Sequence, residues 1–494
     1  MSSGLIITIL SVYFGALLLI AWFTSRKADS DAFFTGNNQS SWYLVAFGMI
    51  GTSVSGVTFI SVPGRVGVDG FSYFQLILGN LLGYFIVARI LMPIYYRSNM
   101  VSIYTFLEER FGFWSYKTGS AFFLLSRTIG SSLRLYLAAQ VLHTFLFEEL
   151  GVSFVFTVGI TILLIWIYTF KGGVKTIIWT DTFQTFFLVG AVIISVCVIS
   201  NQLGWGVVDM VKEVDASKYS TIFHFEDAKA SNYFWKQFIS GIFFTIVLTG
   251  LDQDLMQKNL TCKNLGEAQK NMYWFSIILV IVNFLFLTLG ALLYMYSEKE
   301  GFKIPAQSDF LYPILALKYL GVIAGVFFLL GITASSYASS DSALTALTTA
   351  FCIDFLNFNK GKVENKNRAR IYVHVGFSLL FFIIIILFKE FNKDTSVIKT
   401  VLKAAAYTYG PLLGMFAFGI ISRSRKVKDE WVPLICILSP FLTWGMVIFC
   451  KEVLNYQTAF EDLLINGAIT ALGMYLVSSK AEPVVSSDTA DSGQ

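Results

Sequence analysis

The feature that most constrains this chain is a series of apolar stretches separated by short polar breaks. Many of them match the roughly 20 residues that an α-helix needs to cross a bilayer. Of the 494 residues, 55% are hydrophobic and only 14% are charged, whereas a typical soluble domain carries about 25% charged residues. We therefore expect an all-α membrane protein, and we exclude a soluble enzyme, a secreted disulfide scaffold and a disordered chain.

The apolar stretches predict thirteen transmembrane helices. Their approximate ranges are 4–23, 43–61, 71–95, 119–147, 153–170, 177–201, 233–254, 272–296, 320–352, 371–388, 397–421, 432–450 and 460–478. The first stretch has no basic residues before it and no small-residue cleavage site after it, so we expect a retained helix rather than a signal peptide.

Alternate loops carry clustered basic residues, which the positive-inside rule assigns to the cytoplasm. These are Arg26 and Lys27, residues 97–117, Lys171 and Lys175, Lys258, Lys263 and Lys270, residues 360–370, and residues 423–428. The opposite loops are acidic or mixed, such as the segment 202–230. We expect the N-terminus outside a plasma-type membrane and the C-terminus in the cytoplasm, which fits an odd number of helices.

Residues 51–58 place small and hydroxyl side chains in the middle of the second predicted helix. Two interpretations are open. Small residues allow close helix packing in membranes. Alternatively, the helix is unwound there, because irregular backbone at this depth is tolerated where it lines a cavity, and transporters bind ions and substrate at such breaks.

The predicted helix 320–352 carries a face of small and hydroxyl residues. Ser335, Ala338, Ser339 and Ser342 share this face at helical spacing. Hydroxyl oxygens suit a hard cation, although serines in membrane helices also bond back to their own backbone carbonyls. Asp341 favours the cation site, because an acidic group inside a span is costly and is functional by default.

Each of the other charged residues within the predicted spans has two interpretations. The side chain of Asp181 either extends to the membrane interface or binds a cation transiently as it leaves inward. Arg127 and Arg134 lie seven residues apart; each either pairs with a buried carboxylate or holds an anionic substrate group by bidentate bonds. We interpret Asp252-Gln253-Asp254 as an interfacial helix cap.

The sequence lacks the motifs that mark several functional classes of protein. The sequence has no Walker A motif for ATP, no TVGYG potassium filter, and only three histidines from which to build a catalytic site. Its five cysteines show no CxxC spacing. We therefore expect neither an enzyme nor a nucleic-acid partner.

Four motifs together resemble the sodium:solute symporter family, which includes the sodium/glucose, proline, iodide and sialic acid cotransporters. They are Ser25 to Gly36, the Gly51–Gly56 region, Gly172-Gly173-Val174-Lys175 followed by Trp179-Thr180-Asp181, and Cys352-Ile353-Asp354-Phe355. The resemblance runs from the first helix to the last.

The resemblance implies a LeuT-type fold with two five-helix inverted repeats and discontinuous helices. The repeats would occupy residues 43–201 and 233–421. An additional helix and signature loop (1–42), an extracellular loop (202–232), two C-terminal helices (422–480) and a disordered cytoplasmic tail (481–494) complete the expected organisation.

The resemblance also implies a sodium site, formed by the carbonyls of Gly51 and Val54 with Ser335, Ala338 and Ser339. The family usually has a hydroxyl where Ala338 stands, so either that ligand is lost or the register shifts to Ser339-Ser340. Some members bind a second sodium, and the matching residues here are Asp181, Asp341 and Ser342. We expect a sodium shared by these three, with Asp341 salt-bridged to Arg127 or Arg134 as the alternative.

For the substrate, the resemblance is to the sialic acid transporters. The matching positions are Ser53, Ser55, Thr58, Phe71 and Gln75. Their carboxylate-binding arginine has no ungapped equivalent, because Arg127 and Arg134 lie on either side of its position. We expect one of the two, Arg134 in preference, to reach the substrate cavity.

These features predict a sodium-driven symporter that imports a small polar organic solute, such as a sugar or a sialic-acid-like sugar acid, by alternating access. Its partners would be the solute, sodium and the lipid bilayer, with no obligate protein partner. The alternatives are a proton-coupled or sodium-independent carrier, with Asp341 or Asp181 as the proton site, and a transporter-like membrane sensor, against which the lack of a soluble domain argues.

Overall fold

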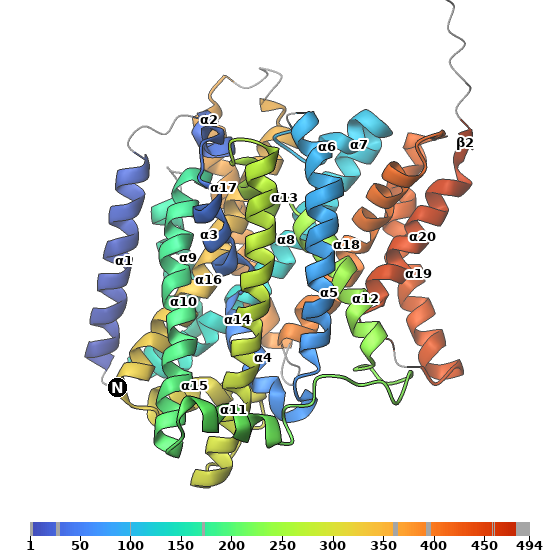
Figure 1. The fold of residues 1–494 in the computed structure, drawn as a ribbon. Helices are drawn as coiled ribbons and strands as arrows, with labels where there is room; N and C mark the ends of the chain where they lie inside the picture. The colour runs from blue at the N-terminus through green and yellow to red at the C-terminus, as the bar shows by residue number, and fades with distance from the viewer. Residues whose placement is uncertain are drawn as a thin grey trace, which may run out of the picture.

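The computed structural model describes residues 3–25, 30–98, 100–169, 173–358, 364–391, 397–456, 458 and 460–480. The expected tail 481–494, the basic pair Arg26 and Lys27, and parts of the loops at 171–172 and 360–363 lie outside the described residues. The helices stand side by side in one bundle, with the N-terminus at one end and β2, the last described element, at the other (Figure 1).

Each predicted span overlaps a helix or a bent pair of helices. The uninterrupted helices are α1 (Ser3–Ser25), α9 (Phe154–Thr169), α10 (Gly173–Leu203), α14 (Leu265–Glu300), α17 (Lys366–Phe391), α18 (Val397–Ile421), α19 (Val432–Val453) and α20 (Asp462–Leu476). Four helices continue into a π-helical turn: α5 (Tyr73–Ile86) into η2 (Val87–Leu91) and then α6 (Met92–Arg97), α8 (Phe113–Leu142) into η3 (His143–Phe147), α12 (Phe234–Thr245) into η4 (Ile246–Gly250), and α16 (Gly321–Ala350) into η6 (Phe351–Phe355).

Two spans are broken rather than continuous. Helices α3 (Trp42–Ser53) and α4 (Gly56–Asp69) meet at 60°, and the α12–η4 segment meets α13 (Gln253–Leu260) at 63°. We name Val54–Ser55 the first break and Leu251–Asp252 the second break. In the described part of the chain, eight helices are long and apolar enough to cross a membrane, or ten if each bent pair counts as one span.

Short elements connect the long helices. They are α2 (Ser30–Thr35), η1 (Gly36–Asn38), α7 (Thr105–Arg110), α11 (Val207–Ala216), η5 (Ser308–Phe310), α15 (Leu311–Lys318) and η8 (Asp429–Trp431). One small ribbon departs from the expected all-α fold, because β1 (Arg425–Val427) pairs antiparallel with β2 (Ser478–Lys480). The segment that contains α11 lies across the end of the bundle where the N-terminus is found (Figure 1).

Burial is distributed as expected for a protein surrounded by lipid. Large apolar side chains such as Leu19, Leu379 and Phe441 are exposed on α1, α17 and α19. An apolar surface of this extent on a soluble protein would be a binding site or an aggregation hazard. In contrast, every residue of α16 from Phe328 to Ala350 is buried, although many are polar. This inverted pattern places the chain in a membrane with α16 at its centre.

The packing of α5 on α12 depends on a close approach of the two backbones. Substituting the glycines at the contact tests this packing. A Cβ atom on Gly79 would overlap the carbonyl oxygen of Phe238, and one on Gly241 would overlap that of Leu76. Gly79→Ala should destabilise the protein by about 1–3 kcal/mol, because overpacking forces helices apart. We expect a clear loss of melting temperature in detergent.

Gly130→Ala on α8 is the matched control, since no heavy atom lies within 4 Å of its added Cβ. Its melting temperature should stay at or slightly above that of the wild type. Equal melting temperatures for both variants would contradict the close packing of α5 on α12.

Candidate functional site

The first break interrupts the helical hydrogen bonds at mid-span. The Val54 amide donates to the Ile50 carbonyl at 2.8 Å, and the bonding resumes where Phe59 donates to Ser55 at 2.9 Å. Ser55 precedes α4 in an extended conformation. The first amides of α4 therefore have no partner within the helix, and the predicted unwound segment is confirmed.

The first break packs directly on the serine-rich part of α16. A Cβ atom on Gly51 would lie 3.6 Å from the Cβ of Ala338, and one on Gly56 would overlap the hydroxyl of Ser336. The Gly51 amide donates to Thr185 Oγ1 of α10 at 3.0 Å. A Cβ atom on Gly51 would overlap this Thr185 hydroxyl, whereas its contact with Ala338 would be an ordinary one. Glycine at 51 and 56 therefore allows the close approach of the first break to α10 and α16.

Ser335 and Ser339 are buried and bond back along their own helix. Each hydroxyl donates to a carbonyl three residues earlier, Ser335 to Ile332 and Ser339 to Ser336, both at 3.1 Å. A hydroxyl that donates one hydrogen keeps its lone pairs as acceptors. Back-bonding and cation coordination are therefore compatible at these positions.

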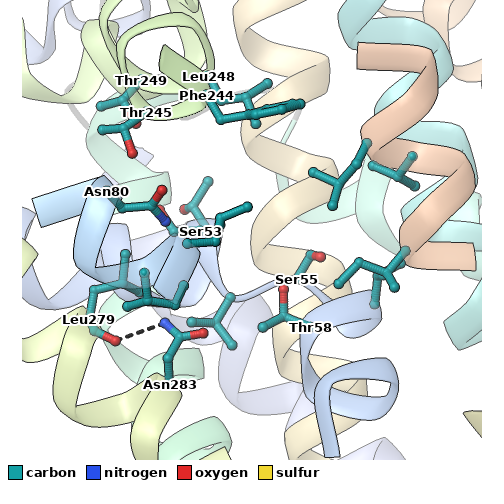
Figure 2. A pocket seen from close by; sticks show the side chains of 18 of the residues that line it. Ser53, Ser55, Thr58, Asn80, Phe244, Thr245, Leu248, Thr249, Leu279 and Asn283 are labelled. Atoms are coloured by element: carbon teal, nitrogen blue, oxygen red, sulfur yellow. Dashed lines mark hydrogen bonds between the residues drawn. The ribbon is translucent and has the colours of Figure 1, made fainter. Parts of the chain in front are cut away.

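A cavity of about 130 Å³ lies beside the first break. Its polar lining comes from Ser53, Ser55, Thr58, Asn80, Arg127, Arg134, Thr245, Thr249 and Asn283, among other residues. Figure 2 shows Ser55 and Thr58 next to each other at the start of α4, with Asn80 and Thr245 across the cavity. The Ser53 hydroxyl is buried and has no hydrogen-bond partner among the described residues.

A second, larger cavity of about 450 Å³ adjoins the first. Tyr73, Ile398 and Leu402 line both cavities. The larger one extends to Asp69 and to Ser231 and Asn232 at the end of the bundle that holds the N-terminus. The small cavity is therefore approached from that end.

The two arginines differ in their partners. Both line the small cavity, so the prediction that only one would reach it is wrong. Arg127 forms ion pairs with Asp254, through a short hydrogen bond, and with Asp252 at 3.5 Å. Arg134 forms no ion pair in the described part of the chain, and its charge remains available to a ligand.

Phe71 and Gln75 lie outside the lining of the small cavity, contrary to the substrate-binding role expected from the resemblance. Phe71 stacks edge-to-face on Phe284, with ring centroids 6.0 Å apart. The Gln75 side chain donates to the Asn232 carbonyl at 2.9 Å and accepts from the His224 amide at 3.1 Å. Gln75 therefore anchors the segment 202–232 rather than facing the cavity.

The second break carries buried acids. Asp252 caps α13 as expected, because its side chain accepts from the Asp254 amide at 2.9 Å. The expected interfacial position is wrong, since Asp252 and Asp254 are both fully buried. Tyr409 of α18 donates to Asp252 at 2.5 Å. The cap thus joins α8 and α18 in the interior of the bundle.

Lys258 on α13 is a functional candidate that the sequence did not reveal. Its ammonium lies 2.5 Å from Asp181 Oδ2, and Lys258 is buried. Thr52, at the end of α3, donates to the same carboxylate oxygen at 3.0 Å. The sequence groups Lys258 with the loop residues Lys263 and Lys270, and its spacing of four from Asp254 is the one sequence signal of a different location.

The remaining residues of the expected second sodium site also have other partners. Tyr168 donates to Asp341 Oδ2 at 2.8 Å, and the Ser342 hydroxyl makes a short hydrogen bond to Asp254. In the described part of the chain, Asp341 forms no ion pair with Arg127 or Arg134. The Oδ1 atoms of Asp181 and Asp341 are buried without hydrogen-bond partners among the described residues.

Solved structures with the same fold are transporters. A substrate-bound, outward-open Na+-coupled sialic acid symporter superposes with a TM-score of 0.81 at 18% identity, covering 96% of this chain and 99% of the other. Mhp1, a nucleobase-cation-symport-1 family transporter, gives a TM-score of 0.55 at 13% identity, covering 91% and 96%.

Relatives in sequence are also transporters. The sodium/sialic acid symporter NanT of Aliivibrio fischeri is 22% identical over 88% of this chain and 86% of its own length. Sodium-coupled monocarboxylate transporter 2 of Danio rerio is 24% identical over 89% and 70%. The family model of the sodium:solute symporter family matches residues 33–426 of this chain. The chain therefore belongs to the sodium:solute symporter family.

Proposed function

We propose that this chain is a symporter that uses a sodium gradient to import a small organic solute carrying a carboxylate group. The observation that supports the carboxylate is Arg134, which lines the cavity without an acidic partner in the described residues. Relatives named for sialic acid and for monocarboxylates transport acids, which fits the same chemistry.

The proposed substrate site combines Arg134 with the start of α4. The first-turn amides of α4 and its helix dipole favour a negative group, and transporters use the ends of broken helices in this way. Ser53, Ser55 and Thr58 would bind polar groups of the solute, and the Ser53 hydroxyl has no competing hydrogen-bond partner among the described residues. Arg127 would instead position α13, because its charge is already matched by two aspartates.

The proposed sodium site lies where the first break meets α16. The carbonyls of Gly51 and Val54 would bind the ion with Ser335, Ala338 and Ser339. The packing of Gly51 on Ala338 supports this register over the shifted alternative at Ser339-Ser340. Oxygen ligands of this kind suit a small hard cation.

The two breaks support an inverted repeat. Each lies in the first helix of one proposed half, 43–201 and 233–421, and paired interruptions at corresponding positions mark such repeats. With thirteen spans, the N-terminus would lie outside a plasma-type membrane and the C-terminus inside. Opposite ends of the bundle hold the N-terminus and residue 480, in line with an odd count (Figure 1).

Transport would proceed by alternating access. Sodium joins the first break to α16 and stabilises the state in which the small cavity opens to the N-terminal end. A ligand shifts such an equilibrium only by its differential affinity for the two states. The solute then enters, and the two repeats rearrange to open the opposite side.

Uptake into proteoliposomes tests this function. An inward sodium gradient should drive accumulation of a carboxylate solute from a panel that includes sialic acids and short monocarboxylates, and their amides should not be accumulated. Uptake that persists in sodium-free buffer and rises at low external pH would instead favour the proton-coupled alternative.

Arg134→Gln should weaken substrate binding roughly ten- to hundred-fold, because hydrogen bonds to charged groups contribute about 1.5–3 kcal/mol each. The melting temperature without substrate should change little, since Arg134 forms no ion pair with any residue that the structure describes. Substrate-dependent thermal stabilisation measures the affinity directly.

Arg127→Gln is the matched control on the same helix. It leaves Asp252 and Asp254 buried without their cation and should cost about 3–5 kcal/mol of stability. The assignment fails if Arg134→Gln binds the carboxylate as tightly as the wild type.

Ser339→Ala should raise the sodium concentration for half-maximal uptake by roughly tenfold, the effect of losing one ligand to a charged group. Recognition of the solute at saturating sodium should be preserved. Ser340→Ala is the control, because Ser340 is equally buried but belongs only to the shifted register. A larger effect at Ser340 would establish the shifted register, and no effect at either serine would refute the site.

A further inference from the structure

The ammonium of a buried lysine pairs with the carboxylate to which the family resemblance assigns a second sodium ion. The Lys258 side chain is 2% exposed, and its ammonium lies 2.5 Å from Asp181 Oδ2. It also makes a short hydrogen bond to the hydroxyl of Thr52. Three elements, α3, α10 and α13, thus converge on one cation that belongs to the protein.

We propose that the ammonium of Lys258 replaces the second sodium, so that the chain couples one sodium to each transported solute. This inference rests on the proposed sodium-driven function. The ammonium is a compact point charge with three donors, and it already neutralises Asp181. A sodium ion bound at the same carboxylate would lie against this fixed positive charge, and the two cations would repel each other in a region of low dielectric.

The charges around the two breaks show which of the protein's own cations already have partners. In the described part of the chain, the carboxylates of Asp181, Asp252, Asp254 and Asp341 lie there with the basic side chains of Arg127, Arg134 and Lys258. Buried charges need partners to be tolerated, and Lys258 and Arg127 have theirs. Arg134 is left for the carboxylate of the solute.

The same side chains would form a sodium site if the ammonium of Lys258 were removed. The Oδ1 atoms of Asp181 and Asp341 are both buried and lack hydrogen-bond partners among the described residues. Removing the ammonium of Lys258 would leave two carboxylates without a compensating cation, and two such groups attract one. Lys258→Gln should therefore acquire the second sodium that the wild type lacks.

The competing explanation is that Lys258 is only a structural link between α13 and α10. Under it, Lys258→Gln would lower stability but leave the number of bound sodium ions unchanged. Counting bound ions separates the two explanations, because a link does not determine stoichiometry.

The experiment measures radiolabelled sodium bound per purified protein at saturation, with no solute present. We expect one ion for the wild type, two for Lys258→Gln, and one again for the charge-balanced double variant Asp181→Asn/Lys258→Gln. Lys258→Arg keeps the positive charge and should still bind one. The sodium dependence of uptake should change in parallel, since the Hill coefficient is limited by the number of sites.

Two sodium ions bound to the wild type would overturn the inference, whatever the variants do. An unchanged count in folded Lys258→Gln would also overturn it. If Lys258→Gln does not fold, Lys258→Met takes its place with the same expected count of two, and an unchanged count in folded Lys258→Met would overturn the inference. Absence of any saturable sodium binding to the wild type would instead refute the proposed sodium-coupled function.

Discussion

The structure depends on how an interrupted helix is tolerated inside a membrane. Lipid offers no hydrogen bonds, so backbone groups released at a break must be bound by protein, ions or water. At the first break, glycines bring the chain against α16, and Gly51 donates to Thr185. At the second break, the Asp252 carboxylate caps α13. The breaks create the polar centre around which the long apolar helices pack.

The second break differs from the first because it is filled by charge. Asp252 and Asp254 form ion pairs with Arg127. Lys258 lies one turn further along α13 and forms an ion pair with Asp181. These pairs connect α13 to α8 and α10. The first break is lined by neutral hydroxyls and by Arg134, and it is there that we propose the sodium and the solute bind. One broken helix is thus fixed by internal ion pairs, and the proposed function assigns the other to the exchangeable ligands.

Much of the fold could be predicted from the sequence, because lipid imposes long apolar stretches and the first break is rich in glycine and serine. The second break could not be predicted, since residues 246–251 hold only Thr249 and Gly250 among apolar residues and lack such a cluster. The sequence indicates a loop position for Lys258, because Lys263 and Lys270 follow it; its pairing with Asp181, 77 positions away, is purely tertiary. Gln75 matched a substrate position, but only the fold shows that it binds the segment 202–232.

The pairing of buried charges has a direct consequence for energetics. One sodium and one carboxylate carry no net charge together, so the membrane potential should not drive accumulation. The decisive measurement is the equilibrium accumulation ratio of a monocarboxylate in proteoliposomes at a fixed sodium gradient, with the potential clamped at 0 and at −100 mV. Equal ratios are expected. With two sodium ions, one net charge crosses per cycle, worth about 2.3 kcal/mol at 100 mV. A ratio roughly fifty-fold higher at −100 mV would therefore contradict the single mobile sodium.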